Sequence, residues 1–184
     1  MQRKGSAYER TISVMLSKWW TNNERDDIFW RSSASGARAT MRKKGGKSTA
    51  NSVGDIMALD PIGQPLLDTF TIEVKRGYSD ELVLIDLIDK PNKKNNKIIL
   101  WWDKLLLECR ENSTRPMLIF RRDRAQACVG LDYSLLSILY DDVGGEVPFN
   151  LSFSKIDLPV IMRLEEFLAW IPPTAIQRSN HVYG

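Results

Sequence analysis

The sequence predicts an α/β domain whose elements follow the order α-β-β-β-α-β. Three observations predict this order. An apolar stripe at helical spacing follows residue 6, residues 70–76 alternate between apolar and polar side chains, and a second helical pattern over 98–110 leads into an apolar run. A chain of 184 residues suits one domain and can bury a core of its own. We therefore expect a single domain over residues 1–184.

The first helix is predicted to begin at Ser6. Ser6-Ala7-Tyr8-Glu9 has the capping-box pattern, in which the serine and glutamate side chains bond N–H groups of the first turn. The apolar stripe that follows consists of Ile12, Met15, Leu16, Trp19 and Trp20. Glu9 lies at the edge of this stripe. It can cap the helix or face a site, and the two roles do not exclude each other.

A short strand over residues 28–31 and a long basic loop are predicted next. Residues 32–52 are rich in Ser, Gly, Ala, Lys and Arg and contain no acidic residue. A loop of this length inside a compact domain is usually functional or disordered. Its basic residues are candidates for phosphate contacts, namely Arg38, Arg42, Lys43, Lys44 and Lys47. The alternative is a solvated loop without a partner. Gly46-Lys47-Ser48 is not a P-loop, because Met41 occupies the position of the first glycine, so we expect no nucleotide cofactor.

Two predicted strands, residues 52–60 and 70–76, carry the candidate chemistry. A segment rich in proline and glycine separates them and is interpreted as a turn. In the second strand, alternation sends Glu73 and Lys75 to one face, one pleat apart, and the apolar residues to the core. If the two strands pair through the turn, Asp55 comes near Glu73.

Two carboxylates and one ammonium at the edge of a sheet suit metal-assisted hydrolysis. Asp55 and Glu73 offer hard oxygen ligands, which suit Mg²⁺ or Mn²⁺ rather than zinc. Such an ion polarises a phosphoryl oxygen and lowers the pKa of a bound water, and Lys75 can orient that water. The alternative is a solvated Glu-x-Lys pair on a strand, worth roughly a few tenths of a kcal/mol.

The distribution of charge fits a polyanionic partner. The net charge is +3, but residues 1–50 hold 11 Lys and Arg against 4 Asp and Glu, whereas residues 51–184 hold 15 against 19. A basic segment beside acidic metal ligands fits a nucleic-acid substrate, and the alternative is a solubilising segment.

The remaining composition argues against several other classes of protein. Two cysteines, Cys109 and Cys128, give neither a zinc motif nor a disulfide framework and are interpreted as small buried apolar residues. The sequence has no apolar run long enough for a bilayer and no signal-peptide core, so we expect the cytoplasm and no membrane partner. His181, the one histidine, lies in a tail that is expected to be loose and is a weak candidate for a base.

Residues after the central strands add further predicted elements. They comprise a short helix over 80–89, the helix over 98–110, strands over 115–122 and 127–131, a helix over 133–139, strands over 149–153 and 159–163, and a helix over 164–170. Pro172-Pro173 is predicted to end the last helix.

The order Asp, a gap, then Glu-x-Lys resembles the signature of the PD-(D/E)XK nuclease superfamily. Here it is Gly54-Asp55 followed by Glu73-Val74-Lys75, with glycine in place of the usual proline. The resemblance covers about residues 4–122. It implies a restriction-endonuclease-like core with a central mixed sheet flanked by helices, followed by a C-terminal β/α elaboration over residues 123–184.

The same resemblance implies an enzyme, a Mg²⁺-dependent (or Mn²⁺-dependent) endodeoxyribonuclease that hydrolyses phosphodiester bonds. Asp55, Glu73 and the Val74 carbonyl would be metal ligands, and Lys75 would orient or activate the attacking water. Arg76, which directly follows the motif, is a further candidate for DNA contact.

The helix opening Lys4-Gly5-Ser6-Ala7-Tyr8-Glu9-Arg10 looks most like that of archaeal and phage Holliday junction resolvases. This implies that Glu9 is an added metal ligand and that a homodimer acts on branched DNA, in recombination or repair, in a bacterial, archaeal or phage-infected cell. Restriction and repair nucleases share the core, so duplex DNA is the other substrate considered. The rival is a non-catalytic DNA-binding or assembly protein, which would have no need of the intact set of Asp55, Glu73 and Lys75.

Overall fold

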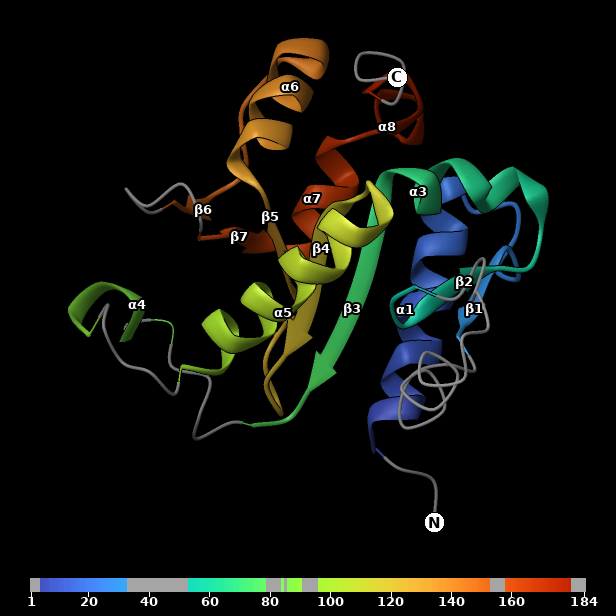
Figure 1. Cartoon of the computed structure of the whole chain (residues 1–184). Coiled ribbons are helices and arrows are strands. Elements are labelled where there is room, and N and C mark those ends of the chain that lie inside the picture. Colours follow the sequence, from blue (N-terminus) through green and yellow to red (C-terminus); the bar gives the residue numbers. More distant parts are fainter. Residues whose placement is uncertain are drawn as a thin grey trace.

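A mixed sheet of five strands lies at the centre of the described part of the chain, as the computed structural model shows in Figure 1. The structure describes residues 4–32, 53–78, 84, 86–90, 96–152 and 158–179. In order across the sheet, the strands are β3 (Phe70–Arg76), β4 (Arg115–Arg121), β5 (Cys128–Leu131), β7 (Val160–Arg163) and β6 (Asn150–Leu151). β3 and β4 are parallel, and the other neighbouring pairs are antiparallel. The predicted fold class is confirmed.

A separate antiparallel ribbon of β1 (Phe29–Arg31) and β2 (Ile56–Ala58) precedes the sheet. The expectation that the strand after residue 52 pairs with β3 through a turn was therefore wrong. The proline-rich segment forms η1 (Pro61–Gly63) and the helix α3 (Gln64–Thr69), because Asp60 caps the first and a proline suits the opening of the second.

Helices cover both faces of the sheet near β3 and β4. α1 (Lys4–Trp20) buries its apolar stripe against the side chains of Ile72, Val74 and their neighbours. α5 (Lys97–Asn112) packs on the opposite face, against Leu118 and Phe120 of β4. Figure 1 shows the two helices on either side of β3 and β4. The alternation of each strand thus divides the core into two clusters.

The start of α1 differs from the sequence prediction. The helix begins at Lys4, so Ser6 lies inside it and does not form the predicted capping box with Glu9. The structure therefore removes the capping role of Glu9 and leaves its side chain to be placed by its contacts.

The C-terminal half follows the predicted order with shifted bounds. α6 (Tyr133–Val143) and α7 (Leu164–Trp170) are present, β6 is shorter than its predicted strand, and α4 (Asp86–Asp89) is the described part of the predicted helix over 80–89. The expectation of a loose tail was wrong for α8 (Pro173–Ser179). Pro173 suits the first turn of a helix, and Ala175 and Ile176 are buried in the core.

Some predicted features lie outside the described residues. These are the five basic candidates of the long loop and His181. Among the helices that the structure describes, none is long and apolar enough to cross a membrane. Cys109 is a free, buried thiol, as predicted, whereas the free thiol of Cys128 is only partly buried.

Candidate metal centre

Asp55 is fixed against the edge of β3 that faces away from β4. Its N–H donates to the Ile72 carbonyl at 2.8 Å, and its carbonyl accepts from the Ser32 N–H at 2.8 Å. Its Oδ2 accepts from the Val74 N–H at 2.9 Å. The residue is only 7% exposed. These bonds set the position of the carboxylate without any strand pairing between β2 and β3.

Gly54 is required by the backbone at this point. Its φ is +80°, and a Cβ atom would lie 2.7 Å from the Ile72 carbonyl oxygen. Proline fixes φ near about −65°, so the proline that usually precedes this aspartate does not fit here. Ser32 Oγ donates to the Gly54 carbonyl at 2.7 Å and holds the turn from its other side. The departure from the usual motif therefore has a local structural cause.

Glu73 and Lys75 extend from β3 toward the face covered by α5. Lys75 Nζ pairs with Glu73 Oε1 and lies 3.8 Å from Asp55 Oδ2. Lys104 Nζ, from α5, lies 4.0 Å from Glu73 Oε1. The structure thus brings the carboxylates of Asp55 and Glu73 to one ammonium group, with a second ammonium beside Glu73.

The backbone of β3 adds a third oxygen to this edge. In an extended strand the N–H and C=O of one residue point to the same side. The Val74 N–H bonds the side chain of Asp55, whereas the Gly77 N–H bonds the Arg121 carbonyl on the side of β4. The Val74 carbonyl therefore faces the same edge as Asp55.

Burial and like charge destabilise the ionised carboxylates. Burial, and then the neighbouring Glu73 carboxylate, raises the pKa of Asp55 from 3.8 to about 7. Burial alone would lower the pKa of Lys75, but the attraction of Glu73 and Asp55 outweighs it and raises that pKa above its ordinary value. Lys75 is thus charged at neutral pH, and the site favours a further cation.

Glu9 approaches the same site from α1. Its Oε2 is buried and has no hydrogen-bond partner among the described residues, and Arg31 Nε lies 3.6 Å away. Burial has the largest effect and raises the pKa of Glu9. The positive charges of Arg31 and Lys75 oppose this shift, and the negative charge of Glu73 adds to it. Glu9 is therefore within electrostatic reach of Lys75 and Glu73.

The donors present are chemically suited to a hard divalent cation. Within the residues that the structure describes, no three His, Cys, Asp or Glu side chains lie close enough to hold a metal ion. Glu9 is thus not gathered with the other two carboxylates. Asp55, Glu73 and the Val74 carbonyl still offer an all-oxygen set, which suits a cation that keeps several waters.

Arg76, the one described DNA-contact candidate, is partly buried, and 30% of its side chain is exposed. Its guanidinium lies 6.0 Å from the centre of the buried Tyr8 ring and 3.6 Å from Asp123 Oδ1. Arg121, its partner in register on β4, lies 5.8 Å from the same ring. Burial raises the pKa of Tyr8 to about 12. The role of Arg76 toward DNA stays a prediction.

Two contributors were missed by the sequence reasoning. Lys104 lies in the second helical pattern, and its place there gives no local signal of its proximity to Glu73. Ser32 directly follows β1 at the start of the long basic loop, and no local signal marks its bonds to Gly54 and Asp55.

Comparison with protein families decides the relationship of the chain. A family model described as phage putative PDDEXK endonuclease matches residues 1–173. The chain belongs to this family. No curated protein and no solved structure matches the chain. The predicted superfamily is confirmed, and the match continues well beyond residue 122, where the sequence resemblance ended.

Membership of the PDDEXK family also fixes the coarse chemistry. Its members are nucleases, they generally use divalent metal ions, and their substrate is DNA. The mixed central sheet with flanking helices is compatible with a restriction-endonuclease-like fold.

Proposed function

We propose that this PDDEXK family member is an endonuclease that depends on Mg²⁺ or Mn²⁺ and cuts branched DNA in the manner of a Holliday junction resolvase, as a homodimer. The observation that supports the site is the convergence of Asp55 and Glu73 on the Lys75 ammonium. The proposed selectivity for branched DNA and the homodimer derive from the resemblance between the opening of the first helix and that of resolvases.

Asp55, Glu73 and the Val74 carbonyl would hold the divalent cation. When bound, the cation supplies Lewis-acid chemistry, which stabilises charge on a phosphoryl oxygen and makes water easier to deprotonate. Asp55 needs little reorganisation for this role, since three backbone hydrogen bonds already fix its main chain and its carboxylate.

Lys75 would act on the attacking water and on the phosphate. Its raised pKa keeps the amine protonated at neutral pH, so it donates hydrogen bonds and stabilises negative charge rather than accepting a proton. Lys104 brings a second ammonium toward Glu73 from the exposed surface of α5 and would contact the phosphate from that side. Both lysines would favour the more negative transition state.

Cleavage of defined DNA substrates tests the proposed function. Wild type and Glu73→Ala are incubated with labelled four-way junction, linear duplex and single-stranded DNA, in Mg²⁺, Mn²⁺ or EDTA. We expect paired symmetric cuts in the junction that disappear in EDTA and in Glu73→Ala, because one carboxylate ligand is lost. Glu108→Ala is the matched control, since Glu108 lies on α5 and pairs with Lys104 at 3.3 Å, so its loss changes the charge equally.

Other outcomes would change the proposal. Cutting of every substrate would retain the nuclease and remove the selectivity for branched DNA. Binding without any cutting, unaffected by Glu73→Ala, would instead favour a non-catalytic DNA-binding or assembly protein.

Glu9→Gln tests whether Glu9 is an added ligand. We expect the affinity for Mn²⁺ to fall by roughly tenfold, because a buried carboxylate within electrostatic reach of Glu73 and Lys75 loses its charge. The measurement is Mn²⁺ titration by calorimetry. Arg31→Gln is the control, because it removes the ion-pair partner of Glu9 and leaves the carboxylate. If neither variant changes Mn²⁺ affinity and both lower the melting temperature, Glu9 serves only to pair with Arg31.

A further inference from the structure

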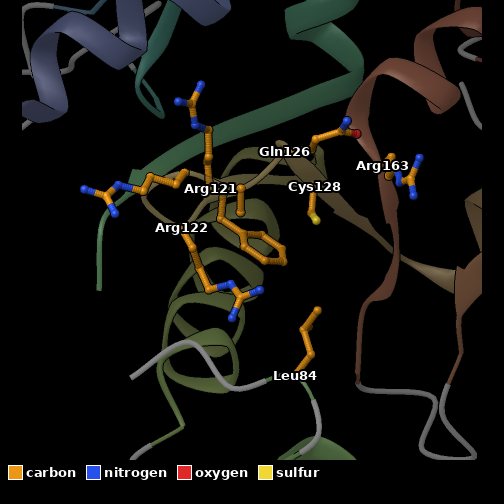
Figure 2. Close-up of a pocket in the computed structure, with 9 residues that line it drawn as sticks. Leu84, Arg121, Arg122, Gln126, Cys128 and Arg163 are labelled. Atoms are coloured by element: carbon orange, nitrogen blue, oxygen red, sulfur yellow. The ribbon is translucent and has the colours of Figure 1, made fainter. Parts of the chain in front are cut away.

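An arginine-lined cavity lies beside the end of β4, on the face of the sheet covered by α5. We call it the arginine pocket. It has a volume of about 430 Å³, and the residues that line it include Arg122, Arg124, Arg163, Cys128 and Leu84. Figure 2 shows Arg122 and Arg163 on opposite sides of the pocket, with the Cys128 thiol between them. Cys128, expected to be a buried apolar residue, therefore lines a cavity that arginines border.

Strand register places this pocket in line with the candidate metal centre. Lys75 is opposite Phe120, Phe120 is opposite Cys128, and Cys128 is opposite Arg163. These residues form one row across four strands, and partners in register send their side chains to the same face. Neighbouring strands are about 4.8 Å apart, so the row places Arg163 roughly 14 Å from Lys75.

The charge of the pocket is poorly balanced within the described residues. None of the described residues that line the pocket is acidic. Arg163 pairs with Glu166 at 3.1 Å, whereas Arg122 and Arg124 form no ion pair with any described residue. Guanidinium groups gathered in this way repel one another, and an anion between them would remove that repulsion.

We propose that the arginine pocket binds one phosphate of the DNA strand that is cut, apart from the phosphate at the metal centre. This inference rests on the proposed function, because it takes the partner to be DNA. The planar guanidinium fork matches two phosphate oxygens, and the cavity has room for a phosphate with its sugar. Phosphates along one strand advance about 3.4 Å each, so a separation of roughly 14 Å places the contacted phosphate about four positions from the scissile bond.

The salt dependence of DNA binding tests the pocket without any cleavage. Arg122→Gln/Arg163→Gln is compared with wild type on labelled duplex and four-way junction in EDTA, over a series of salt concentrations. Losing one phosphate contact reduces the slope of log affinity against log salt by about 0.9, and we expect affinity at low salt to fall roughly tenfold. Lys18→Gln/Arg110→Gln is the matched control, since both residues are exposed on helices and the change in charge is equal.

Single-turnover cleavage separates the pocket from the metal centre. The pocket variant should need roughly tenfold more DNA for half-maximal rate, with the rate at saturation unchanged. A melting temperature equal to that of the control confirms folding, and the single variant Arg122→Gln, at an exposed residue, replaces the double variant if that one unfolds. Wild-type slope and affinity in the folded variant would overturn the proposal, as would a lowered saturating rate with unchanged binding.

Two further outcomes separate this inference from the proposed function and from binding of a free anion. If the pocket variant lowers the slope of log affinity against log salt but wild type never cuts DNA, the proposed function is wrong and the pocket remains a phosphate site. Inorganic phosphate alone is the second probe. If it raises the melting temperature of wild type but not of the variant, while the DNA slope is equal in both, the pocket serves a free anion and the DNA proposal is wrong.

Discussion

Asp55→Asn is expected to stabilise the cation-free protein at pH 8 and to abolish cleavage. Burial and Glu73 raise the pKa of Asp55 from 3.8 to about 7 in the folded state. Because this pKa is higher in the folded than in the unfolded protein, protonated Asp55 contributes stability. This contribution is complete below about pH 4 and is lost as the pH rises through about 7. Asparagine removes that loss and still offers an oxygen to the Val74 N–H.

The size of the effect follows from the same shift. Three pKa units, which already include the attraction of Lys75, correspond to at most about 4 kcal/mol. Asp55 titrates as part of a coupled pair that shares this shift, so we expect roughly 2 kcal/mol for Asp55 alone. For a chain of this length we expect a melting temperature about 4–8 °C higher in Asp55→Asn, measured at pH 8 in EDTA, with little difference at pH 4. Cleavage should fall by roughly 10³-fold or more, because a metal ligand becomes neutral.

The controls for Asp55→Asn use the cation and a second aspartate. Adding Mn²⁺ should raise the melting temperature of wild type and leave that of the variant unchanged, since only wild type binds the ion. Asp103→Asn, at an exposed position of α5, should behave as wild type in both respects. Equal melting temperatures for wild type and Asp55→Asn at pH 8 would contradict the explanation.

Gly54→Ala is expected to displace Asp55 and damage both stability and cleavage. An alanine Cβ would lie 2.7 Å from the Ile72 carbonyl oxygen, at a φ of +80° that a non-glycine residue rarely adopts. We expect a loss of roughly 2 kcal/mol or more in the free energy of unfolding and about 10²-fold in the single-turnover rate. Thermal melting and cleavage of a labelled substrate measure the two effects.

Gly145→Ala separates backbone strain from the close approach. Gly145 has a similar φ of +82°, but no atom of the described structure lies within 4 Å of the place that an alanine Cβ would occupy. This variant should lose about 1 kcal/mol from strain alone and retain full cleavage. A similar loss of activity in both variants would mean that the contact between Gly54 and Ile72 does not position Asp55.

Periodicity predicted the elements of this fold better than their pairing. Alternation along Phe70–Arg76 fixed the face of Glu73 and Lys75, because side-chain direction in a strand is a local property. The strand that pairs with residues 56–58 could not be predicted, because the sequence pattern of so short a strand is compatible with either β1 or β3. Tertiary contacts determine which of the two it pairs with.

The same division holds for the candidate site. The spacing of Glu73 and Lys75 is visible in the sequence, and Asp55 was found by resemblance to a family signature. The need for glycine at position 54 depends on a backbone that is 18 residues further along the chain, so no local pattern reveals it. The arginine pocket likewise depends on register between β4, β5 and β7, which joins residues far apart in sequence.

The bonds of Asp55 to β3 also affect how the protein behaves toward other copies of itself. An edge strand with unpaired N–H and C=O groups is a template for intermolecular pairing. Asp55 occupies the Ile72 carbonyl and the Val74 N–H on the outer edge of β3, so it blocks that template at its middle. The Asp55 side chain therefore serves solubility as well as chemistry, because a residue 55 without an acceptor would leave the Val74 N–H on this edge open to pairing with another chain.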